Sequence, residues 1–245
     1  MFFSDIHSHL LYGTDDGAKD REDMFKLVDA AYENGFRLIC VTPHFAPAYF
    51  DDNREAAMHA YKALTEYCAE KYSDLKLFMG NELFYTHDSI SWLKQRLCIP
   101  MGDTRYVLVE FDIHERADLI AEAFDRILSI GYIPILAHAE RYKRLTVGRL
   151  ETLKESGTLV QMNAEAITGT FRYSFGYKRR AKALLNAKLV DFISTDCHDM
   201  QKRPPEIKAA YELLREKYGE KMANALCRDN AYELFSLDDG GKERA

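Results

Sequence analysis

Short apolar runs alternate with longer amphipathic segments along most of the chain. The amphipathic segments repeat apolar residues every three or four positions, which is typical of helices that bury one face. In residues 21–34 the apolar side chains form one such stripe, and Gly35, a residue type that commonly ends helices, follows it. On this pattern we expect helices at residues 21–34, 53–71, 87–96, 115–130, 150–156, 178–187, 206–218 and 222–234.

The short apolar runs predict seven β-strands. The first ends at His9, and the others are expected at residues 37–42, 75–79, 106–110, 133–138, 159–163 and 190–196. Strands that alternate with helices form a parallel sheet covered by helices, which is either a closed barrel or an open, doubly wound sheet. No Gly-x-Gly-x-x-Gly turn or Walker loop follows the first strand, so neither nucleotide-binding fold is favoured.

The composition is that of an ordinary soluble globular protein, with 47% hydrophobic and 29% charged residues among 245. We expect one domain over residues 1–245, because no long linker or fixed-period repeat divides the chain. The net charge of −6 gives no reason to expect nucleic-acid binding. We expect neither a membrane span nor a signal peptide. The five scattered cysteines include no Cys-x-x-Cys pair, which argues against disulfides or a thiolate zinc site and favours a cytoplasmic location.

The end of the first predicted strand carries two histidines on one face. Side chains alternate along a strand, so His7 and His9 in the Asp-Ile-His-Ser-His segment at residues 5–9 point the same way. Two imidazoles in this arrangement form half of a metal site, and the acidic Asp15 and Asp16 follow in the next turn. On these residues alone, the alternative is an ordinary pair of surface or packed histidines beside an acidic turn.

Further imidazoles and carboxylates stand at or just beyond the ends of other predicted strands. They are His44, Glu82, Glu110, His138, Asp196 and His198, whereas the sixth strand gives only Asn163. Each alone has an ordinary explanation as a turn residue, a helix cap or a solvated charge. In a parallel barrel, however, the carboxyl ends of all strands meet at one face, where active residues cluster. So many carboxylates and imidazoles in one cleft require cations to offset their repulsion.

The chemistry of these residues narrows the choice of metal. Imidazole and carboxylate ligands without a thiolate pair favour manganese, iron, cobalt or zinc over a structural zinc finger. The ligands outnumber those that one ion can bind, so two or three divalent ions are expected. Clusters of this kind activate a bridging water and bind phosphoryl oxygens.

Five segments together resemble the polymerase and histidinol phosphatase (PHP) superfamily. They are Asp-Ile-His-Ser-His at 5–9, Thr-Pro-His at 42–44, Gly-Asn-Glu at 80–82, Ala-His-Ala-Glu-Arg-Tyr at 137–142 and Thr-Asp-Cys-His at 195–198. The fourth segment, with Asp-Asp-Gly at 15–17 and the strand containing Asn163, is similar to the manganese-dependent protein-tyrosine phosphatases of bacterial capsule and exopolysaccharide operons. The resemblance extends from about residue 3 to the carboxyl-terminal helices.

The resemblance implies a fold and a set of ligands. The fold would be an α/β, distorted (β/α)7 parallel barrel of the PHP type, with the metal site at the carboxyl ends of its strands. The first ion would be bound by His7, His9, Glu82 and Asp196, the second by Glu82, Glu110 and His138, and the third by Asp16, His44 and His198. Asp16 is preferred to Asp15 because its distance from the His-x-His pair matches the family.

The resemblance also implies how the reaction would proceed. Manganese would be the expected metal, and a hydroxide bridging two ions would attack phosphorus in line. Arg141 and Arg203 match the arginines that bind phosphate in these enzymes. The tyrosine phenolate, with a pKa of about 10, would leave with or without help from a metal-bound water or His44. Asp199 departs from the family, where an amide is often found, and would either weaken phosphate binding or support a ligand.

The expected substrate is a phosphotyrosine protein, by resemblance the tail of a membrane-anchored tyrosine autokinase that controls capsule or exopolysaccharide synthesis. Aromatic side chains after the second and sixth strands would flank the phosphotyrosine ring, and the cations Lys178, Arg179 and Arg180 would attract an acidic tail. Alternatively, the aromatics pack locally and the basic run is a solvated helix start. The aromatics are Phe45, Tyr49, Phe50, Phe171, Tyr173, Phe175 and Tyr177.

Other functions are alternatives. Histidinol phosphate or another small phosphoester would be the substrate of a different phosphatase of the same superfamily. A non-catalytic module of a polymerase is a further alternative, but we see no polymerase segment in this sequence. A metal-dependent amidohydrolase is another, and the lack of a clear bridging lysine at a strand end argues against it. Cys197 stands between two proposed ligands, and it would act as a nucleophile only in an electropositive, open site.

Overall fold

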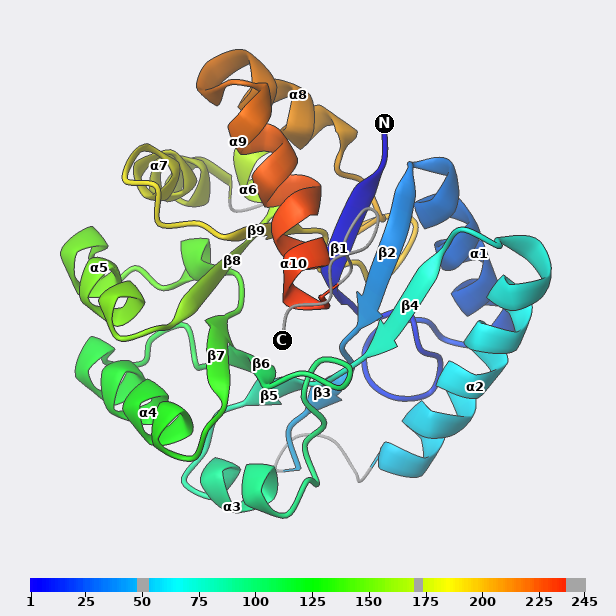
Figure 1. Cartoon of the computed structure of the whole chain (residues 1–245), viewed down its shortest axis with the longest axis horizontal. Coiled ribbons are helices and arrows are strands. Elements are labelled where there is room, and N and C mark those ends of the chain that lie inside the picture. Colours follow the sequence, from blue (N-terminus) through cyan, green and yellow to red (C-terminus); the bar gives the residue numbers. More distant parts are fainter. Residues whose placement is uncertain (48–52, 170–173, 237–245) are drawn as a thin grey trace.

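Parallel strands form a ring in the computed structural model, which describes residues 1–47, 53–169 and 174–236. Figure 1 shows this ring with most of the helices on its outside. The predicted alternation of strands and helices is confirmed, and every strand pairs in parallel with its neighbours. The strands are β1 (Phe3–Ser8), β2 (Phe36–Val41), β3 (His44–Phe45), β4 (Lys76–Met79), β5 (Glu82–Phe84), β6 (Tyr106–Glu110), β7 (Ile133–Leu136), β8 (Leu159–Asn163) and β9 (Phe192–Ser194).

The helices follow the predicted positions, with two additions and one difference. The additions are η1, a short 3-10 helix after β7, and α6, a single turn directly after β8. The difference is that the last predicted helix comprises three consecutive helical segments, α9, η2 and α10. In the described part of the chain, no helix has the length and apolar character needed to cross a membrane. The helices are α1 (Arg21–Glu33), α2 (Arg54–Lys71), α3 (Ser89–Lys94), α4 (Ala117–Ser129), η1 (Ala139–Arg141), α5 (Val147–Glu155), α6 (Ala164–Thr168), α7 (Ser174–Asn186), α8 (Lys208–Tyr218), α9 (Glu220–Asn224), η2 (Ala225–Asp229) and α10 (Asn230–Leu234).

The second and third predicted strands are found as β2 and β4, and each is followed, after an interruption, by a short strand that was not predicted, β3 or β5. β2 stops before Pro43, which has no N–H group to continue the ladder, and β3 begins after it. β4 and β5 are separated at Gly80, where a Cβ atom would lie 3.0 Å from Met101 Cα. The side chain of Asn81 donates to Pro43 O at 3.1 Å and accepts from Ile99 N at 2.8 Å. These bonds hold the two interruptions side by side, and they distort the ring.

The interruptions divide the ring into two sheets with the orders β1-β2-β4 and β3-β5-β6-β7-β8-β9. The two sheets meet again between β1 and β9. Asp196 N donates to His7 O at 2.9 Å, and His9 N donates to Cys197 O at 2.8 Å, next to an isolated bridge between Ser8 and Cys197. The chain just after β9 is therefore joined to the carboxyl end of β1, where His7 and His9 lie.

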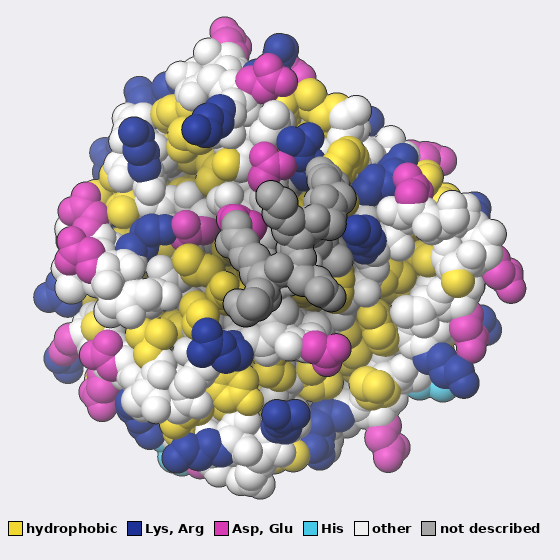
Figure 2. Space-filling view, viewed as in Figure 1, with side chains coloured by type: hydrophobic (Ala, Val, Ile, Leu, Met, Phe, Trp, Pro, Cys, Tyr) yellow, Lys and Arg dark blue, Asp and Glu magenta, His cyan; other side chains and the backbone are white. Residues whose placement is uncertain are grey.

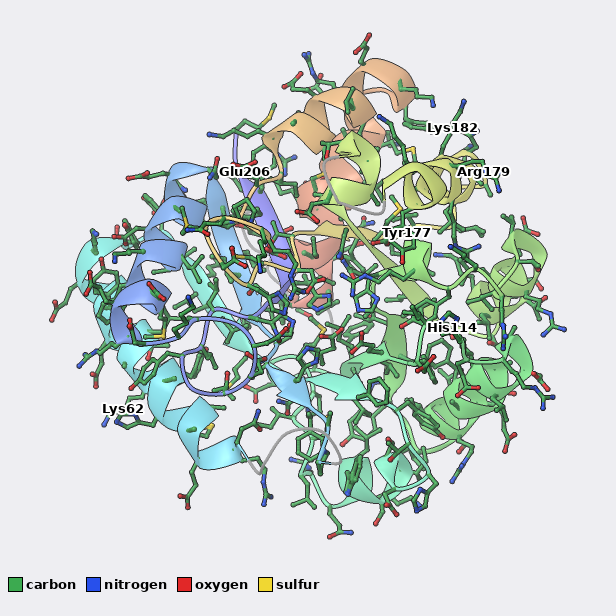
Figure 3. All side chains as sticks on the ribbon, turned by 180° about the vertical axis from the view of Figure 1, so that it is seen from behind. Lys62, His114, Tyr177, Arg179, Lys182 and Glu206 are labelled. Atoms are coloured by element: carbon green, nitrogen blue, oxygen red, sulfur yellow. The ribbon has the colours of Figure 1, made fainter. Side chains whose placement is uncertain are left out.

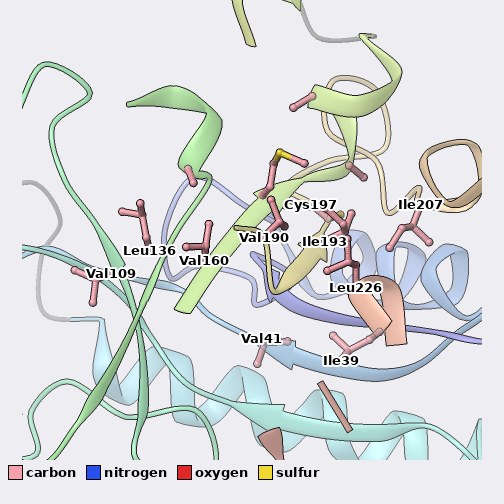
Figure 4. Packing of buried hydrophobic residues seen from close by; sticks show 14 of the residues in the cluster. Ile39, Val41, Val109, Leu136, Val160, Val190, Ile193, Cys197, Ile207 and Leu226 are labelled. Carbon is pink, nitrogen blue, oxygen red and sulfur yellow. The ribbon is translucent and has the colours of Figure 1, made fainter. Parts of the chain in front are cut away.

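Most of the apolar core lies between the strands and the outer helices. Met24, Leu27, Val28 and Ala31 of α1 are buried, which confirms the predicted stripe. Figure 4 shows the side of this layer that the strands provide, with Val41 among the labelled residues. Burial of a Val or Leu side chain contributes about 1.5–3 kcal/mol, so this layer supplies much of the driving force for folding.

A second, smaller core fills the inside of the ring at the amino-terminal ends of the strands. Inward-facing residues such as Ile6, Leu38 and Leu108 form one buried cluster with Leu234 of α10 and the following Phe235. The Phe235 ring also stacks on Phe78, with 4.0 Å between the ring centroids. In Figure 1, α10 lies across the centre of the ring, and Figure 2 shows hydrophobic, basic and acidic side chains mixed on this face. The carboxyl-terminal end of the ring is therefore the end left for polar side chains.

Candidate metal centre

Five histidines and four acidic residues meet at the carboxyl ends of the strands. Six of them line a cavity of about 480 Å³, together with Arg141 and Arg203. The structure thus brings together every side chain that the sequence proposed as a metal ligand or a phosphate-binding group. The nine are His7, His9, Asp16, His44, Glu82, Glu110, His138, Asp196 and His198.

The candidate ligands form three groups, and within each group the ligand atoms all lie within 4.8 Å of one another. In the predicted ligand sets only Glu82 is shared between two ions, whereas in the structure His9 and His44 also belong to two groups. The side chains are therefore close enough for adjacent ions to share ligands. The groups are His9, Asp16, His44 and His198; His7, His9 and Glu82; and His44, Glu82 and Glu110.

His7 faces the site with its Nε2 atom, because its Nδ1 atom is engaged on the other side. Gln161 Oε1, from β8, lies 3.2 Å from His7 Nδ1 and also accepts the backbone N–H of His138 at 2.6 Å. An amide oxygen has no proton to donate, so His7 Nδ1 must be the donor. In a neutral His7 ring, Nε2 then carries the lone pair that can bind a metal ion.

An acidic residue orients His9 in the same way. Asp15 Oδ2 lies 2.7 Å from His9 Nδ1 and accepts the backbone N–H of His44 at 2.9 Å, and the Asp15 side chain is fully buried. Gly17 closes this turn because a Cβ atom there would lie 2.1 Å from His9 O. The two acids of the Asp-Asp-Gly segment therefore differ: Asp15 orients His9, and Asp16 lines the cavity.

The two oriented rings create a place for positive charge. His7 Nε2 and His9 Nε2 are 3.2 Å apart, and they lie 3.1 and 3.2 Å from Glu82 Oε2. Burial acts to lower the pKa of His9, but Asp15 and Glu82 raise it well above its usual value. Between neutral rings, three lone pairs would face one another in a buried position, and a proton or a metal ion removes that repulsion. The nitrogen and oxygen donors fit a divalent transition metal.

Glu82 lies at the centre of the cluster. Its Oε1 is 3.0 Å from His138 Nε2, and its Oε2 is 3.2 Å from His44 Nδ1. His138 Nε2 also lies 3.2 Å from Glu110 Oε1. Burial and the charge of Arg141 act to lower the pKa of His138, but Glu110 and Glu82 raise it to about 9. Protons and metal ions therefore compete for this position, so acid should weaken metal binding.

The two oxygens of Asp196 have different surroundings. Oδ2 accepts hydrogen bonds from Asn163 Nδ2 at 2.9 Å and from Arg141 Nη2 at 2.6 Å. Oδ1 lies 3.5 Å from Nε2 of both His7 and His9. Burial acts to raise the pKa of Asp196, but His7 and Arg141 hold it well below its usual value. The residue is therefore a carboxylate, and Oδ1 is the oxygen that faces the imidazoles.

Asp16, His198 and Arg203 form the outer edge of the cluster. Asp16 Oδ1 lies 3.2 Å from His198 Nε2 and 3.6 Å from His44 Nε2, and Asp16 Oδ2 accepts from Arg203 Nη2 at 3.2 Å. The backbone N–H of His198 donates to Arg203 O at 3.0 Å. This backbone bond closes a loop that returns Arg203 to the cavity, although it follows β9 by several residues.

Two of the proposed ligands occupy unusual backbone conformations. His138, which follows β7, has φ +32°, and Asp196, which follows β9, has φ +54°. Residues other than glycine rarely adopt this left-handed backbone conformation, and those that do concentrate at functional sites. In both cases the chain turns sharply at the end of its strand, which places the side chain at the cavity.

Sequence reasoning gave no role to three buried polar residues that support the ligands. Gln161 Nε2 donates to Asn163 Oδ1 at 2.8 Å, and Asn163 in turn holds the carboxylate at the end of β9. Asp5 accepts the backbone N–H groups of His7 and Thr195, both at 3.1 Å. A usable signal was present: Gln161 and Asn163 alternate along an otherwise apolar strand, so both point to the face where the other strands carry ligands.

Cys197 has the spacing but not the environment of a nucleophile. Five residues separate it from Arg203, as in the Cys-x5-Arg motif of ordinary tyrosine phosphatases. Its side chain is fully buried among apolar residues, and burial raises the pKa of the thiol well above its usual value. A thiol in this state is not a reactive thiolate, so the structure gives no support to cysteine catalysis.

The other residues singled out in the sequence lie in varied positions. Asp199 Oδ1 accepts the backbone N–H groups of Gln201 and Lys202 at 2.7 and 2.6 Å, so this acid supports the loop that carries Arg203. Phe45 is buried against Trp92, which agrees with local packing. The predictions for Tyr49, Phe50, Phe171, Tyr173 and the Phe175 side chain lie outside the part that the structure describes.

Known proteins of one kind resemble this chain over nearly its whole length. The family model described as "Capsular polysaccharide synthesis, CpsB/CapC" matches residues 3–236. A protein named tyrosine-protein phosphatase CpsB from Streptococcus pneumoniae is 32% identical over 236 residues, covering 94% of this chain and 97% of the relative. One named tyrosine-protein phosphatase YwqE from Bacillus subtilis (strain 168) is 27% identical over 220 residues, covering 89% and 86%. A solved structure also matches, from a description of crystal structures of YwqE and CpsB as metal-dependent tyrosine phosphatases. Its TM-score is 0.85 and its identity 26%, and the match covers 95% of this chain and 94% of that structure.

Proposed function

Because this chain belongs to the CpsB/CapC family of capsular polysaccharide synthesis, we propose that it is a metal-dependent protein-tyrosine phosphatase. The observation that carries the proposal is the facing pair of His7 Nε2 and His9 Nε2 beside Glu82, a buried arrangement of donors that calls for a cation. The proposed domain is the whole chain, residues 1–245, because its ligands come from both ends of the sequence.

The donor set fits two or three divalent ions. We assign the ligand role to the nine clustered residues, with manganese as the expected metal and iron, cobalt or zinc as alternatives. When bound, such ions lower the pKa of a coordinated water and bind phosphoryl oxygens. Gln161, Asp15 and Asn163 orient the ligands, so the side chains need little rearrangement when ions bind.

Arg141 and Arg203 are the proposed phosphate-binding groups. Both line the cavity, and each donates to a carboxylate of the cluster, Arg141 to Asp196 and Arg203 to Asp16. A guanidinium has five N–H donors, so these contacts leave others for the phosphate oxygens. Because both arginines are already oriented by carboxylates, they would bind the phosphate without a large loss of side-chain entropy.

His44 has a second proposed role at the leaving group. It lines the cavity and lies between Glu82 and Asp16, at 3.2 and 3.6 Å. A phenolate with a pKa of about 10 is a moderately good leaving group, so an imidazole that donates a hydrogen bond would be of limited help. We therefore expect His44 to matter more through metal binding than through proton transfer.

The proposed substrate is the phosphorylated tail of a membrane-anchored tyrosine autokinase in capsule or exopolysaccharide synthesis. The family description supports the pathway, and the names of the relatives support phosphotyrosine. Such a kinase tail would meet the enzyme in the cytoplasm. Histidinol phosphate is the alternative substrate, because the resemblance to the PHP superfamily extends to enzymes of that kind.

The test is phosphate release from a peptide with several phosphotyrosines, with added manganese, with chelator, and from a His7→Ala variant. We expect release that needs the metal and is lost in the variant, while circular dichroism shows that the variant is folded. Histidinol phosphate is assayed beside the peptide. Brisk hydrolysis of histidinol phosphate without release from the peptide would move the function to the alternative, and inactivity on both would contradict a phosphatase.

A further inference from the structure

A groove separate from the metal cavity runs between α7 and α8, with a volume of about 700 Å³. Its floor is apolar and is formed by Ile167 of α6, Ala181 and Leu185 of α7, and Leu213 of α8. Leu213 is 43% exposed, which is unusual for a leucine in an apolar setting. An apolar floor of this size can bury a large side chain of a bound partner.

The rim of the groove is basic. It carries Lys178, Arg179, Lys182 and Lys217, with Glu216 as the acid, so the formal charge of the rim is about 4 − 1 = +3. The whole chain has a net charge of −6, so this rim is a local reversal of sign. Within the described residues, Arg179 and Lys182 form no ion pair, and Figure 3 shows them at the outer edge of α7. These charges are therefore available to a partner.

The groove is mechanically tied to the metal centre. Arg180, between the two outward cations on α7, turns inward and donates to Ala139 O at 3.0 Å and Leu145 O at 2.5 Å. These carbonyls flank Arg141, the proposed phosphate-binding residue. α6, which lines the groove, begins directly after Asn163, which bonds to a proposed ligand. A segment held in the groove would therefore have a fixed relation to the cavity.

We propose that the groove binds an acidic segment of the phosphotyrosine protein that carries a large apolar side chain, at a distance from the phosphotyrosine itself. This inference rests on the proposed function. The apolar side chain would lie on the floor, and acidic neighbours would pair with Arg179, Lys182 and Lys217. Because rim charges act mainly on association, the contribution should weaken as salt rises.

The experiment compares three substrates under steady-state conditions with manganese. Two are phosphotyrosine peptides of equal length, one with a Glu-Leu-Glu segment and one with Lys-Leu-Lys in its place, and the third is 4-nitrophenyl phosphate. The test variant is Arg179→Glu with Lys182→Glu. The matched control is Lys62→Glu with Lys94→Glu, which changes the charge equally on α2 and α3, outside the groove.

We expect the test variant to raise KM for the Glu-Leu-Glu peptide about tenfold, with kcat unchanged. Hydrolysis of 4-nitrophenyl phosphate should be unchanged, and the control should change every value less than about twofold. An unphosphorylated Glu-Leu-Glu peptide should inhibit hydrolysis of its phosphorylated form competitively but not hydrolysis of 4-nitrophenyl phosphate. Leu213→Ser, on the exposed floor, should have the same effects as the charge reversal.

Several results would overturn the groove assignment. Equal effects on all three substrates would show that the variant disturbs the metal centre, and unchanged KM would show that the groove does not bind the peptide. A dimer that the charge reversal dissociates, with KM unchanged, would make the groove an interface between two copies of this chain. Equal hydrolysis of both peptides by the unaltered protein would reject the groove alone, whereas no hydrolysis of either peptide would reject the proposed function as well.

Discussion

The two ends of the strand ring are built from the same strands, yet they carry different chemistry. At the amino-terminal end, residues such as Ile6 and Leu38 pack against Leu234 and Phe235, and the contacts are apolar. At the carboxyl-terminal end, strands of the same ring carry His7 and other imidazoles and carboxylates that lie 3 to 4 Å apart. The first end stabilises the fold, and the second gathers the candidate metal ligands.

The difference shows how one strand serves both purposes. Ile6 and His7 are adjacent in β1, where the pairing with β2 is irregular between Asp5 and Ser8. Ile6 belongs to the inner apolar core, and His7 reaches the polar cluster. Shortening a side chain at the apolar end should lower the free energy of unfolding. Changing a side chain at the polar end should lower activity first. Substitutions at the two ends should therefore separate activity from stability.

The largest expected effect is on activity, from Glu82→Gln. Glu82 lies within 3.2 Å of ring nitrogens of four histidines, so its charge influences every group of ligands. Metal ions contribute several kcal/mol to stabilising a phosphoryl transition state, so kcat/KM should fall about 10³-fold or more. The measurement is manganese-dependent phosphate release. A fall smaller than tenfold, in a variant that binds metal normally, would contradict a central role for Glu82.

At the other end of the ring, Leu38→Ala should act on stability alone. Leu38 is fully buried in the inner core, and removing its methyl groups leaves a cavity beside α10. We expect the free energy of unfolding to fall by about 2–5 kcal/mol, as urea denaturation would show. At 15 °C, well below unfolding, kcat with saturating manganese should equal that of the unaltered protein. A lower kcat under those conditions would mean that the two ends are coupled.

A smaller effect is expected from Asp15→Asn, which tests how the polar end is held. One Asp15 oxygen accepts from both His9 Nδ1 and His44 N, and an amide retains only one good acceptor oxygen. Loss of such a supporting group should weaken manganese binding about 10–100-fold, as titration calorimetry of the metal-free protein would show. Thr65→Ala, in α2 and outside the candidate metal centre, is a control that should leave the affinity unchanged. Unchanged affinity in Asp15→Asn would indicate that His9 is oriented by other contacts.

The smallest effect concerns a carboxylate outside both ends. Asp29 of α1 accepts from Lys71 Nζ at 2.7 Å and from the hydroxyls of Tyr67 and Tyr72. Burial acts to raise the pKa of Asp29, but these hydrogen bonds lower it. A lowered folded-state pKa adds stability above the unfolded value of about 3.9, and this stability is lost as pH falls through the folded value.

Asp29→Asn should therefore reduce the free energy of unfolding by about 1 kcal/mol at pH 7, and the difference should shrink below pH 4. Urea denaturation at several pH values measures it. The difference should be the same with and without manganese, because Asp29 is not near the polar end. If the difference in the free energy of unfolding depended on manganese, the pH effect on α1 would be coupled to the metal centre.

The strand and helix pattern was predictable because each element has its own hydrophobic period. The stripe on α1 and the strand at residues 106–110 are found where the sequence placed them. The short strands β3 and β5, which follow Pro43 and Gly80, were not predicted, because their positions depend on contacts with residues such as Met101 and Ile99, which come from a distant loop. α6 was also missed, since a single turn has too few residues to show a period.

The candidate ligands were found in the sequence because the carboxyl ends of parallel strands meet, so residue types at strand ends suffice to predict a cluster. Their partners were not found. Gln161, Asp15 and Asn163 look like ordinary polar residues until the hydrogen bonds to His7, His9 and Asp196 are seen. The difference between Asp15 and Asp16 also depends on the turn that Gly17 folds back on the strand.

The sequence alone determined the order of the elements, the residue types at the strand ends and therefore the class of chemistry, because these follow from local periodicity and ligand preference. Only the tertiary structure decided which nitrogen of each histidine faces the site, that Cys197 is buried beyond reach, and that α10 closes one end of the ring. These features depend on contacts between residues far apart in the chain, and no local pattern encodes such contacts.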